Sequence, residues 1–419
     1  MHRFLAFAFV ALLSLPATAQ DILVPMDARQ SDHIKAYGVA FWTLEKGIDL
    51  DWLLNYRGGS FLFSNFEGLE NELRVRGVYY EAISATQADA ILREVQSDAQ
   101  NMDVVRLEKA PRIAVYAPSQ TMPWDDAVLI AMTYAEVPYE MIYDDEVLSG
   151  ELSNYDWLHM HHEDFTGQYG KFITYRNQAW YIEQQRALEA SARKHGFRKV
   201  SELKLAVVKT IRDYLLQGGF LFSMCSGTDT FDIALAAQNT DIVPPEYDGD
   251  PIDPDALSKL DFGETLAFEN FRPEFRAHVY EYSDIDSGPP PPQLANPAVD
   301  YFTLFDFSAK WDPVPSMLTQ NHVATVKGFV GQTTNFRKKV IKPNVVILAE
   351  APGRDEVRYL HAPYGQGFFT FYGGHDPEDY QHFVGDPETD LSLHKNSPGY
   401  RLILNNILFP AAKKKKQKT

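Results

Sequence analysis

Short apolar runs alternate with amphipathic segments along most of this chain, and this alternation constrains the fold more than any other feature. Residues 22–26 form an apolar run, residues 32–44 follow with helical spacing, and residues 51–56 form the next apolar run. Strand-length runs separated by helical segments predict parallel strands joined by helical crossovers. The sequence therefore predicts an α/β protein whose mostly parallel sheet is flanked by helices.

Two units are predicted along the chain. Residues 21–108 form an N-terminal βαβ unit, and a second α/β unit runs from residue 109 to residue 412. Between about residues 239 and 343 its pattern is interrupted by a segment rich in proline and acidic residues. We interpret this segment as an insertion, and its position makes it a candidate cover over the site. Residues 413–419 form a basic tail, which predicts a solvated C-terminus.

The first 20 residues have the order of a secretory signal peptide. A basic start at His2 and Arg3 precedes an apolar run over residues 4–15 and the small residues 17–19. That run is too short to span a bilayer, and no later stretch is long and apolar enough. We therefore expect a periplasmic or secreted protein without stable membrane insertion. The formal net charge of -18 disfavours binding to nucleic acid.

The chain has one cysteine, Cys225. It follows the apolar run 219–224 and precedes Ser226, Gly227 and a helical segment, which is the arrangement of a nucleophile elbow. In such a turn the N–H groups and dipole of the following helix lower the pKa of the thiol. They also offer an oxyanion donor, here the Ser226 N–H. The alternative is a buried structural cysteine.

A histidine with two neighbouring acids follows the last strong strand. Residues 368–372 lead through two glycines to His375, with Asp376 adjacent and Glu378 three residues on. A cysteine nucleophile needs an imidazole as its base and a carboxylate to orient that imidazole, and either acid is a candidate. Because both motifs follow predicted strands, we expect them at one carboxyl edge of the sheet. The alternative is that the acids cap a turn and that His375 is a structural histidine whose hydrogen bonds are satisfied.

A histidine-rich segment and one arginine are further candidates. On a strand, His159 and His161 share one face, as two metal ligands need. A polar rim of the pocket, formed by His161, His162 and Glu163, is the interpretation we favour. Arg57 precedes two glycines at a strand end, where it can hold a carboxylate or a phosphate, or simply belong to a tight turn.

From about residue 112 onward, these motifs resemble the class I glutamine amidotransferase-like superfamily. Cys225 and Gly227 match its G-x-C-x-G elbow, with Ser223 at the first glycine, whereas Glu378 stands three rather than two residues after His375. Residues 364–377 are similar to the trehalose-utilisation (ThuA-like) branch. The whole chain resembles exported bacterial proteins labelled "asparagine synthetase B". The resemblance implies a flavodoxin-like, glutamine amidotransferase-like sheet and a Cys-His-acid triad.

The leading expectation is a cysteine-dependent amidohydrolase or glutaminase-like hydrolase. Cys225 attacks a small carboxamide or ester, and His375 acts as base and then as acid. The expected partner is this small-molecule substrate, and no cofactor is expected. Two alternatives stay open: a non-catalytic ThuA-like binding or scaffold protein of the envelope, and a metal-dependent hydrolase acting through His159 and His161.

Overall fold

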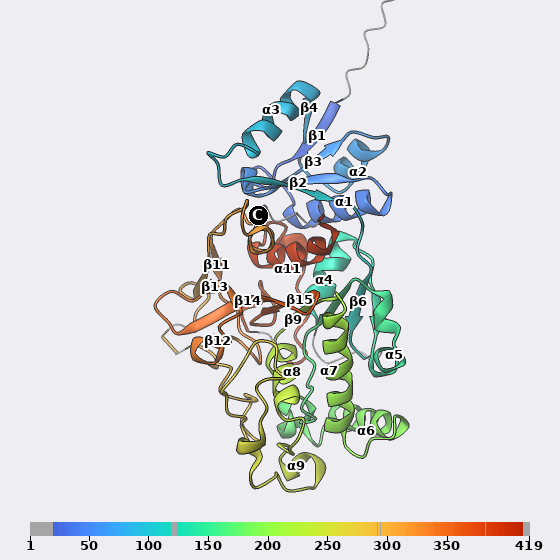
Figure 1. Ribbon diagram of the computed structural model, residues 1–419, viewed down its shortest axis with the longest axis vertical. Helices are drawn as coiled ribbons and strands as arrows, with labels where there is room; N and C mark the ends of the chain where they lie inside the picture. Colours follow the sequence, from blue (N-terminus) through green and yellow to red (C-terminus); the bar gives the residue numbers. More distant parts are fainter. Residues whose placement is uncertain (1–19, 119–124, 291, 294, 382, 414–419) are drawn as a thin grey trace, which may run out of the picture.

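The computed structural model describes residues 20–118, 125–290, 292–293, 295–381 and 383–413 and contains two β-sheets with helices between and around them (Figure 1). The chain is a mixed α/β protein, which confirms the predicted fold class at that level. The predicted signal peptide falls almost entirely on residues 1–19, outside the described residues. The predicted division between residues 108 and 109 stays a prediction.

The N-terminal sheet has five strands in the order β4-β1-β3-β2-β5, and each of its pairings is antiparallel. Its strands are β1 (Gln20–Val24), β2 (Leu50–Leu54), β3 (Ser60–Ser64), β4 (Glu81–Ser84) and β5 (Asp103–Leu107). Its helices are α1 (His33–Glu45), α2 (Leu69–Val75) and α3 (Ala85–Val95).

The parallel pairing predicted for the N-terminal unit is not found, and the short β2–β3 connection explains why. Residues 55–59 are too few for the crossover that a parallel pair needs, so β3 returns antiparallel beside β2. Strand β1 pairs with the other side of β3, which leaves β1 and β2 parallel but separated. Helix α1 is the predicted crossover between them, and the Asp32 carboxylate caps it by accepting from the Lys35 N–H at 2.9 Å.

The large sheet has ten strands, of which nine follow the order β11-β10-β13-β14-β15-β9-β8-β6-β7 while β12 pairs with β14. Its parallel half consists of β15 (Gly367–Tyr372), β9 (Phe220–Met224), β8 (Trp157–Met160), β6 (Ile113–Tyr116) and β7 (Glu140–Ile142). Its antiparallel half consists of β10 (Tyr301–Leu304), β11 (Thr325–Lys327), β12 (Phe336–Arg337), β13 (Val346–Glu350) and β14 (Glu356–Tyr364).

The sheet is therefore mixed, and a mostly parallel sheet is not confirmed. The segment 239–343, interpreted as an insertion, supplies β10, β11 and β12 to the antiparallel half. Strands β14 and β15 are joined by a two-residue turn, so they too pair antiparallel.

Helices form a layer between the two sheets. Helices α1, α4 (Ala127–Ala135) and α11 (Pro398–Leu408) lie there (Figure 1). One hydrophobic core runs from Trp52 and Phe61 of the small sheet through these helices to Trp157 and Phe222 of the large sheet. A second core covers the other face with α5 (Asp144–Ser149), α7 (Val200–Leu216) and α8 (Ser226–Ala236). The remaining α-helices are α6 (Ala179–Lys194), α9 (Pro245–Asp248) and α10 (Pro313–Leu318).

Two adjacent residues of α11 connect the small sheet to the end of β15. The Arg401 guanidinium donates to the Tyr37 hydroxyl at 3.0 Å, to the Met26 carbonyl at 3.1 Å and to the Gly58 carbonyl. The Tyr400 hydroxyl donates to Asp376 at 2.8 Å. The last helix thus fixes the turn after β15 relative to the small sheet.

Candidate metal centre

The parallel half of the large sheet brings the predicted functional segments to one edge. Cys225 follows β9, residues 161–163 follow β8 and His375 follows β15, and these strands are neighbours in the order β15-β9-β8. Strand β6 lies beyond β8, and the segment after it includes Asp125 and Asp126. Parallel strands end at the same edge, which is where open α/β sheets bind ligands.

Cys225 occupies the strand-to-helix turn that the sequence predicts. It joins β9 to α8 with φ 49° and ψ -137°, a conformation that non-glycine residues rarely adopt. Gly227 lies so close to His161 that a Cβ there would come within 2.8 Å of its carbonyl oxygen. The Gly227 N–H donates to that oxygen at 2.7 Å. Gly227 therefore couples the turn to the histidine segment, and its N–H is already engaged.

The Cys225 thiol does not have the lowered pKa that the turn predicts. Its Sγ accepts from the Gln332 N–H at 3.2 Å, and it is also hydrogen-bonded by the backbones of Thr333 and Ser226. Burial raises the pKa of the thiol to about 11, which outweighs these bonds. The oxyanion role of the Ser226 N–H stays a prediction, since this group bonds the sulfur. Residues 332 and 333 belong to the expected cover, and they do contact the cysteine.

Neither acid predicted to orient His375 does so. Asp376 Oδ1 accepts from the Glu378 N–H at 2.8 Å, and its Oδ2 accepts from the Tyr400 hydroxyl. The Glu378 carboxylate lies 3.1 Å from His394. A carboxylate that opens a turn is satisfied by the N–H groups of that turn, which is the capping alternative the sequence left open. The predicted Cys-His-acid triad is therefore corrected in its third member.

Three histidine rings meet at this edge of the sheet. The ring centroids of His161 and His162 are 4.0 Å apart. The centroid of the His375 ring lies 4.8 Å from that of His161 and 4.7 Å from that of His162. Each ring offers a nitrogen, and these three atoms lie within 4.8 Å of one another. Burial and the neighbouring histidines hold the pKa of His162 well below its usual range, so this ring is neutral. Three neutral imidazoles form the ligand set of many catalytic zinc sites.

Residues 125 and 126 engage all three rings from outside. Asp126 Oδ1 lies 3.2 Å from His161 Nδ1, Asp125 Oδ1 lies 3.8 Å from His375 Nε2, and the His162 ring hydrogen-bonds the Asp125 backbone. Metal-binding histidines ordinarily direct their second ring N–H to a carboxylate or a carbonyl, which fixes the tautomer and the ring orientation. His161 Nε2 is then the atom left for a ligand: it is buried, and it has no hydrogen-bond partner among the described residues.

His159 holds Asp126 rather than facing the other rings. Its Nε2 lies 3.1 Å from both Asp126 carboxylate oxygens, and its Nδ1 lies 3.1 Å from the Phe222 carbonyl. A carbonyl only accepts, so His159 Nδ1 is the donor in its contact with Phe222. Burial acts to raise the pKa of Asp126, but His159 and His161 hold it well below its usual range. Asp126, His159 and His161 also form a possible ligand set, although hydrogen bonds already join its members.

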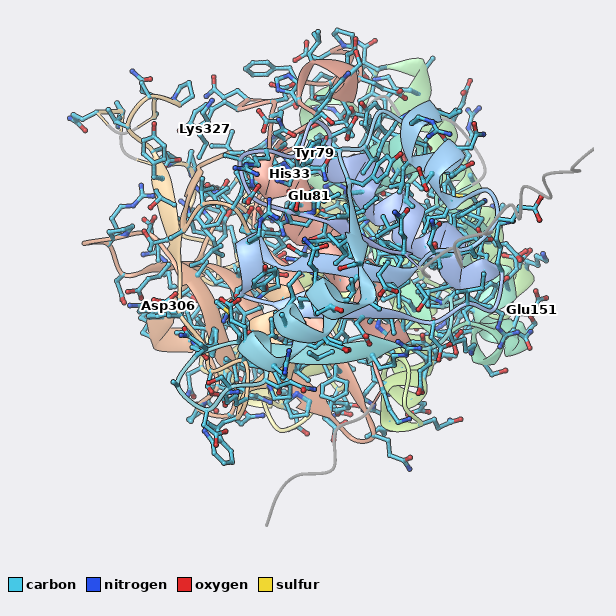
Figure 2. The ribbon with its side chains drawn as sticks, turned by 90° about the horizontal axis from the view of Figure 1, so that it is seen from above. His33, Tyr79, Glu81, Glu151, Asp306 and Lys327 are labelled. Atoms are coloured by element: carbon cyan, nitrogen blue, oxygen red, sulfur yellow. The ribbon has the colours of Figure 1, made fainter. Side chains whose placement is uncertain are left out.

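Two further predicted residues lie in different places. The half-buried Glu163 follows His162 and lines a cavity beside it, and burial raises the pKa of its carboxyl to about 7. The Arg57 guanidinium donates to Asp27 at 2.8 Å and twice to Glu81 at 3.0 Å, on the N-terminal sheet. Figure 2 views this region from above, where Glu81 lies near the centre. Arg57 is thus engaged in ion pairs away from the histidine segment.

Sequence reasoning missed Asp125, Asp126 and Gln332. Asp126 caps α4 by accepting from the Val128 and Leu129 N–H groups at 2.8 Å and 3.1 Å. An acid before a helical run is a readable cap signal, but a cap does not predict a contact with a histidine. Gln332 lies in the segment that the sequence left without regular structure, and no motif marks it.

No protein-family model and no curated protein matches this chain. Two solved structures are similar in part. "Cytoplasmic Protein STM3548 from Salmonella typhimurium" is 11% identical with a TM-score of 0.34, covering 73% of this chain and 100% of that one. "Cytoplasmic Protein STM1381 from Salmonella typhimurium LT2" is 11% identical with a TM-score of 0.35, covering 72% and 99%. Likeness at this level transfers no role to this chain.

The exported location requires a correction. Both matched structures carry the titles of cytoplasmic proteins, in contrast to the periplasmic or secreted location predicted from residues 1–20, and that prediction is withdrawn. Among the helices of the described residues, none has the length and apolarity needed to cross a membrane.

Proposed function

We propose that this protein is a metal-dependent hydrolase that cleaves a small carboxamide or ester. The observation that carries the proposal is the cluster of His161, His162 and His375, whose outer ring atoms are engaged by residues 125 and 126. These three histidines would hold a divalent ion such as zinc, which would lower the pKa of a bound water and polarise a carbonyl oxygen. The proposal departs from the expectation of an enzyme without a cofactor.

The residues of the chain divide the remaining work. His161, His162 and His375 each contribute one ring nitrogen to hold the ion. Asp126 keeps the His161 ring in one tautomer, so that Nε2 carries the lone pair. Glu163, which follows His162 and lines the adjoining cavity, would contact the substrate.

A cysteine-dependent hydrolase is the second candidate, and the backbone conformation of Cys225 favours it. In that reaction Cys225 attacks the carbonyl carbon while His375 accepts the thiol proton and passes it to the departing amine or alcohol, and water then hydrolyses the thioester. A glutamine amidotransferase-like, ThuA-like relationship of the parallel half is part of the same proposal. The position of Cys225 between β9 and α8 supports this relationship. The raised pKa of the thiol disfavours the cysteine-dependent reaction.

The experiment measures metal content and hydrolysis on the same preparations. Purified protein is assayed for zinc by mass spectrometry and for cleavage of p-nitrophenyl acetate and of a p-nitroanilide. Both are repeated after EDTA treatment and after zinc is returned. We expect one tightly bound ion per chain, with activity lost on chelation and restored by zinc. His162→Gln should abolish both, and the matched control His278→Gln, at an exposed histidine outside the cluster, should change neither.

Cys225→Ala separates the two candidates. Metal-dependent activity that survives this substitution supports the metal centre. Hydrolytic activity that is unaffected by EDTA and is lost in Cys225→Ala would overturn the metal proposal in favour of acyl-enzyme chemistry. A preparation that binds no divalent ion and cleaves neither ester nor anilide would overturn both.

A further inference from the structure

A cavity of about 490 Å³ adjoins the histidine cluster. His162 and Glu163 belong to its lining, so the cavity and the cluster share a wall. It lies at the carboxyl ends of β6, β7 and β8. The chain leaves β6 toward β7 on one side and leaves β8 toward β9 on the other, which makes this the switch point where open α/β sheets bind ligands. The volume suits a small organic molecule.

Lysines neutralise two of the carboxylates that line this cavity. Lys204 Nζ lies 2.9 Å from Asp144, and both side chains are almost fully buried. Lys194 pairs with Asp145 at the outer end. Both lysines of the lining are therefore committed to a carboxylate and are poorly placed to bind an anionic ligand.

Two more lining carboxylates are satisfied by the backbone. Glu146 accepts from the Tyr143 N–H at 2.9 Å. Asp164 accepts from the N–H groups of Thr166, Gln168 and Gly170 in the loop after it, at distances between 2.7 Å and 3.0 Å. Backbone hydrogen bonds therefore hold these two carboxyl groups in the cavity wall.

Glu163 and Glu183 complete the acidic lining, and within the described residues neither has an ion-pair partner. The lining thus holds more carboxylates than it has cations to neutralise them. His162, which lines the cavity, stacks its ring on the buried His161 outside the lining. An excess of carboxylates around a cavity of this size favours a positively charged ligand.

The aromatic residues of the lining favour a cation as well. Tyr143, Tyr169 and Trp180 line the cavity. The Lys204 ammonium already sits 4.2 Å from the centre of the Tyr143 ring. Aromatic faces attract ammonium groups, and the attraction grows when the cation is withdrawn from water.

We infer that this cavity binds a small molecule carrying a protonated amine, and that the substrate cleaved at the histidine cluster presents its amine there. The second half of the inference rests on the proposed function, whereas the first half does not. Glu163 is the principal partner of the amine, because it joins the cavity to the histidine segment. Glu183, on α6, contributes charge from farther out.

Calorimetric titration with three probes of one shape tests the inference. Benzylamine, benzyl alcohol and benzoate are titrated into the full chain, both after EDTA treatment and after zinc loading. We expect benzylamine to bind on the order of tenfold or more tightly than benzyl alcohol, and benzoate to bind least in metal-free protein. Salt should weaken the binding of the amine and leave that of the alcohol unchanged.

Variants locate the site. Glu163→Gln keeps the shape of the side chain and should remove most of the preference for the amine, and Glu183→Gln should reduce it less. Glu189→Gln is the matched control, since Glu189 is on α6 but outside the cavity and pairs with Arg193. Equal binding of amine and alcohol, or an unchanged preference in Glu163→Gln, would overturn the inference. Amine binding without bound metal or hydrolysis would instead retain the cavity and overturn the proposed function.

Discussion

Polar side chains are paired on the small sheet, whereas at the carboxyl edge of the large sheet some buried polar atoms lack a hydrogen-bond partner among the described residues. On the small sheet, Arg57 meets two carboxylates within 3.0 Å, and each partner comes from the same sheet region. At the edge of the large sheet, three histidine rings face one another, and the buried His161 Nε2 is without a hydrogen-bond partner in the described part of the chain. Satisfied ion pairs indicate structure, whereas unsatisfied buried polar atoms indicate a ligand.

The largest expected effect concerns Asp126, because it belongs to the edge and touches a proposed ligand. Asp126→Asn keeps a side chain that can cap α4 but removes the charge that faces His161 and His159. Metal affinity should fall about 10–100-fold, as it does when the carboxylate behind a ligating histidine is lost. Competition with a chelator measures it. An affinity equal to that of the unaltered protein would mean that Asp126 serves only the helix.

The next effect concerns the contact between the cysteine turn and the histidine segment. Gly227→Ala places a Cβ 2.8 Å from the His161 carbonyl oxygen and 2.8 Å from Ser223 Oγ, and the carbonyl oxygen cannot swing away. We expect a loss of about 3 kcal/mol in the free energy of unfolding, together with weaker metal binding. Gly263→Ala is the control, since its nearest neighbour is the carboxylate of Asp261 at 3.1 Å. Urea unfolding compares the two, and equal stabilities would show that the elbow and His161 move independently.

A smaller effect depends on pH and asks whether Cys225 belongs to the core. Burial raises the pKa of its thiol to about 11, so the unfolded thiol ionises first as pH rises. Stability relative to Cys225→Ala should therefore be constant below about pH 9 and fall by about 2 kcal/mol toward pH 11. Alkylation of the folded thiol by iodoacetamide should follow the same window. A thiol that titrates below pH 8 would restore the cysteine-dependent candidate.

The smallest effect is expected on the small sheet. Arg57→Gln removes ion pairs whose members are about a quarter exposed, and water screens part of their energy. The free energy of unfolding should fall by about 1 kcal/mol, and metal binding and amine binding should not change. Loss of either binding activity in Arg57→Gln would break the contrast between the two regions.

Local signals predicted most of the individual elements. The helix after Asp32 and the strand before Cys225 are each fixed by short-range spacing and caps. Strand direction was less accessible, since it depends on connection length and on β3 and β14, whose runs the sequence analysis did not separate. Because these two strands were not recognised, the sequence predicted parallel pairing where the small sheet is antiparallel and the large sheet is mixed.

The candidate site was predicted in part for a related reason. Each histidine was visible as a residue at a strand end, and the sheet edge brought them together as expected. Their partners were not visible, because Asp125 and Asp126 follow a different strand and are distant in sequence from His161 and His375. The acids that lie next to His375 in sequence are used by their own turn instead. Proximity in the chain was therefore a poor guide to which carboxylate serves which ring.

The bond from Arg401 to the Met26 carbonyl spans 375 positions of the chain, and this has a consequence during synthesis on the ribosome. The small sheet and α1 emerge first, but the side of α1 that packs on α11 has no cover until α11 has been translated. Tyr400, beside Arg401, also anchors the turn that carries His375. The packing of α1 and the closing of the histidine cluster therefore both depend on a segment that is synthesised late.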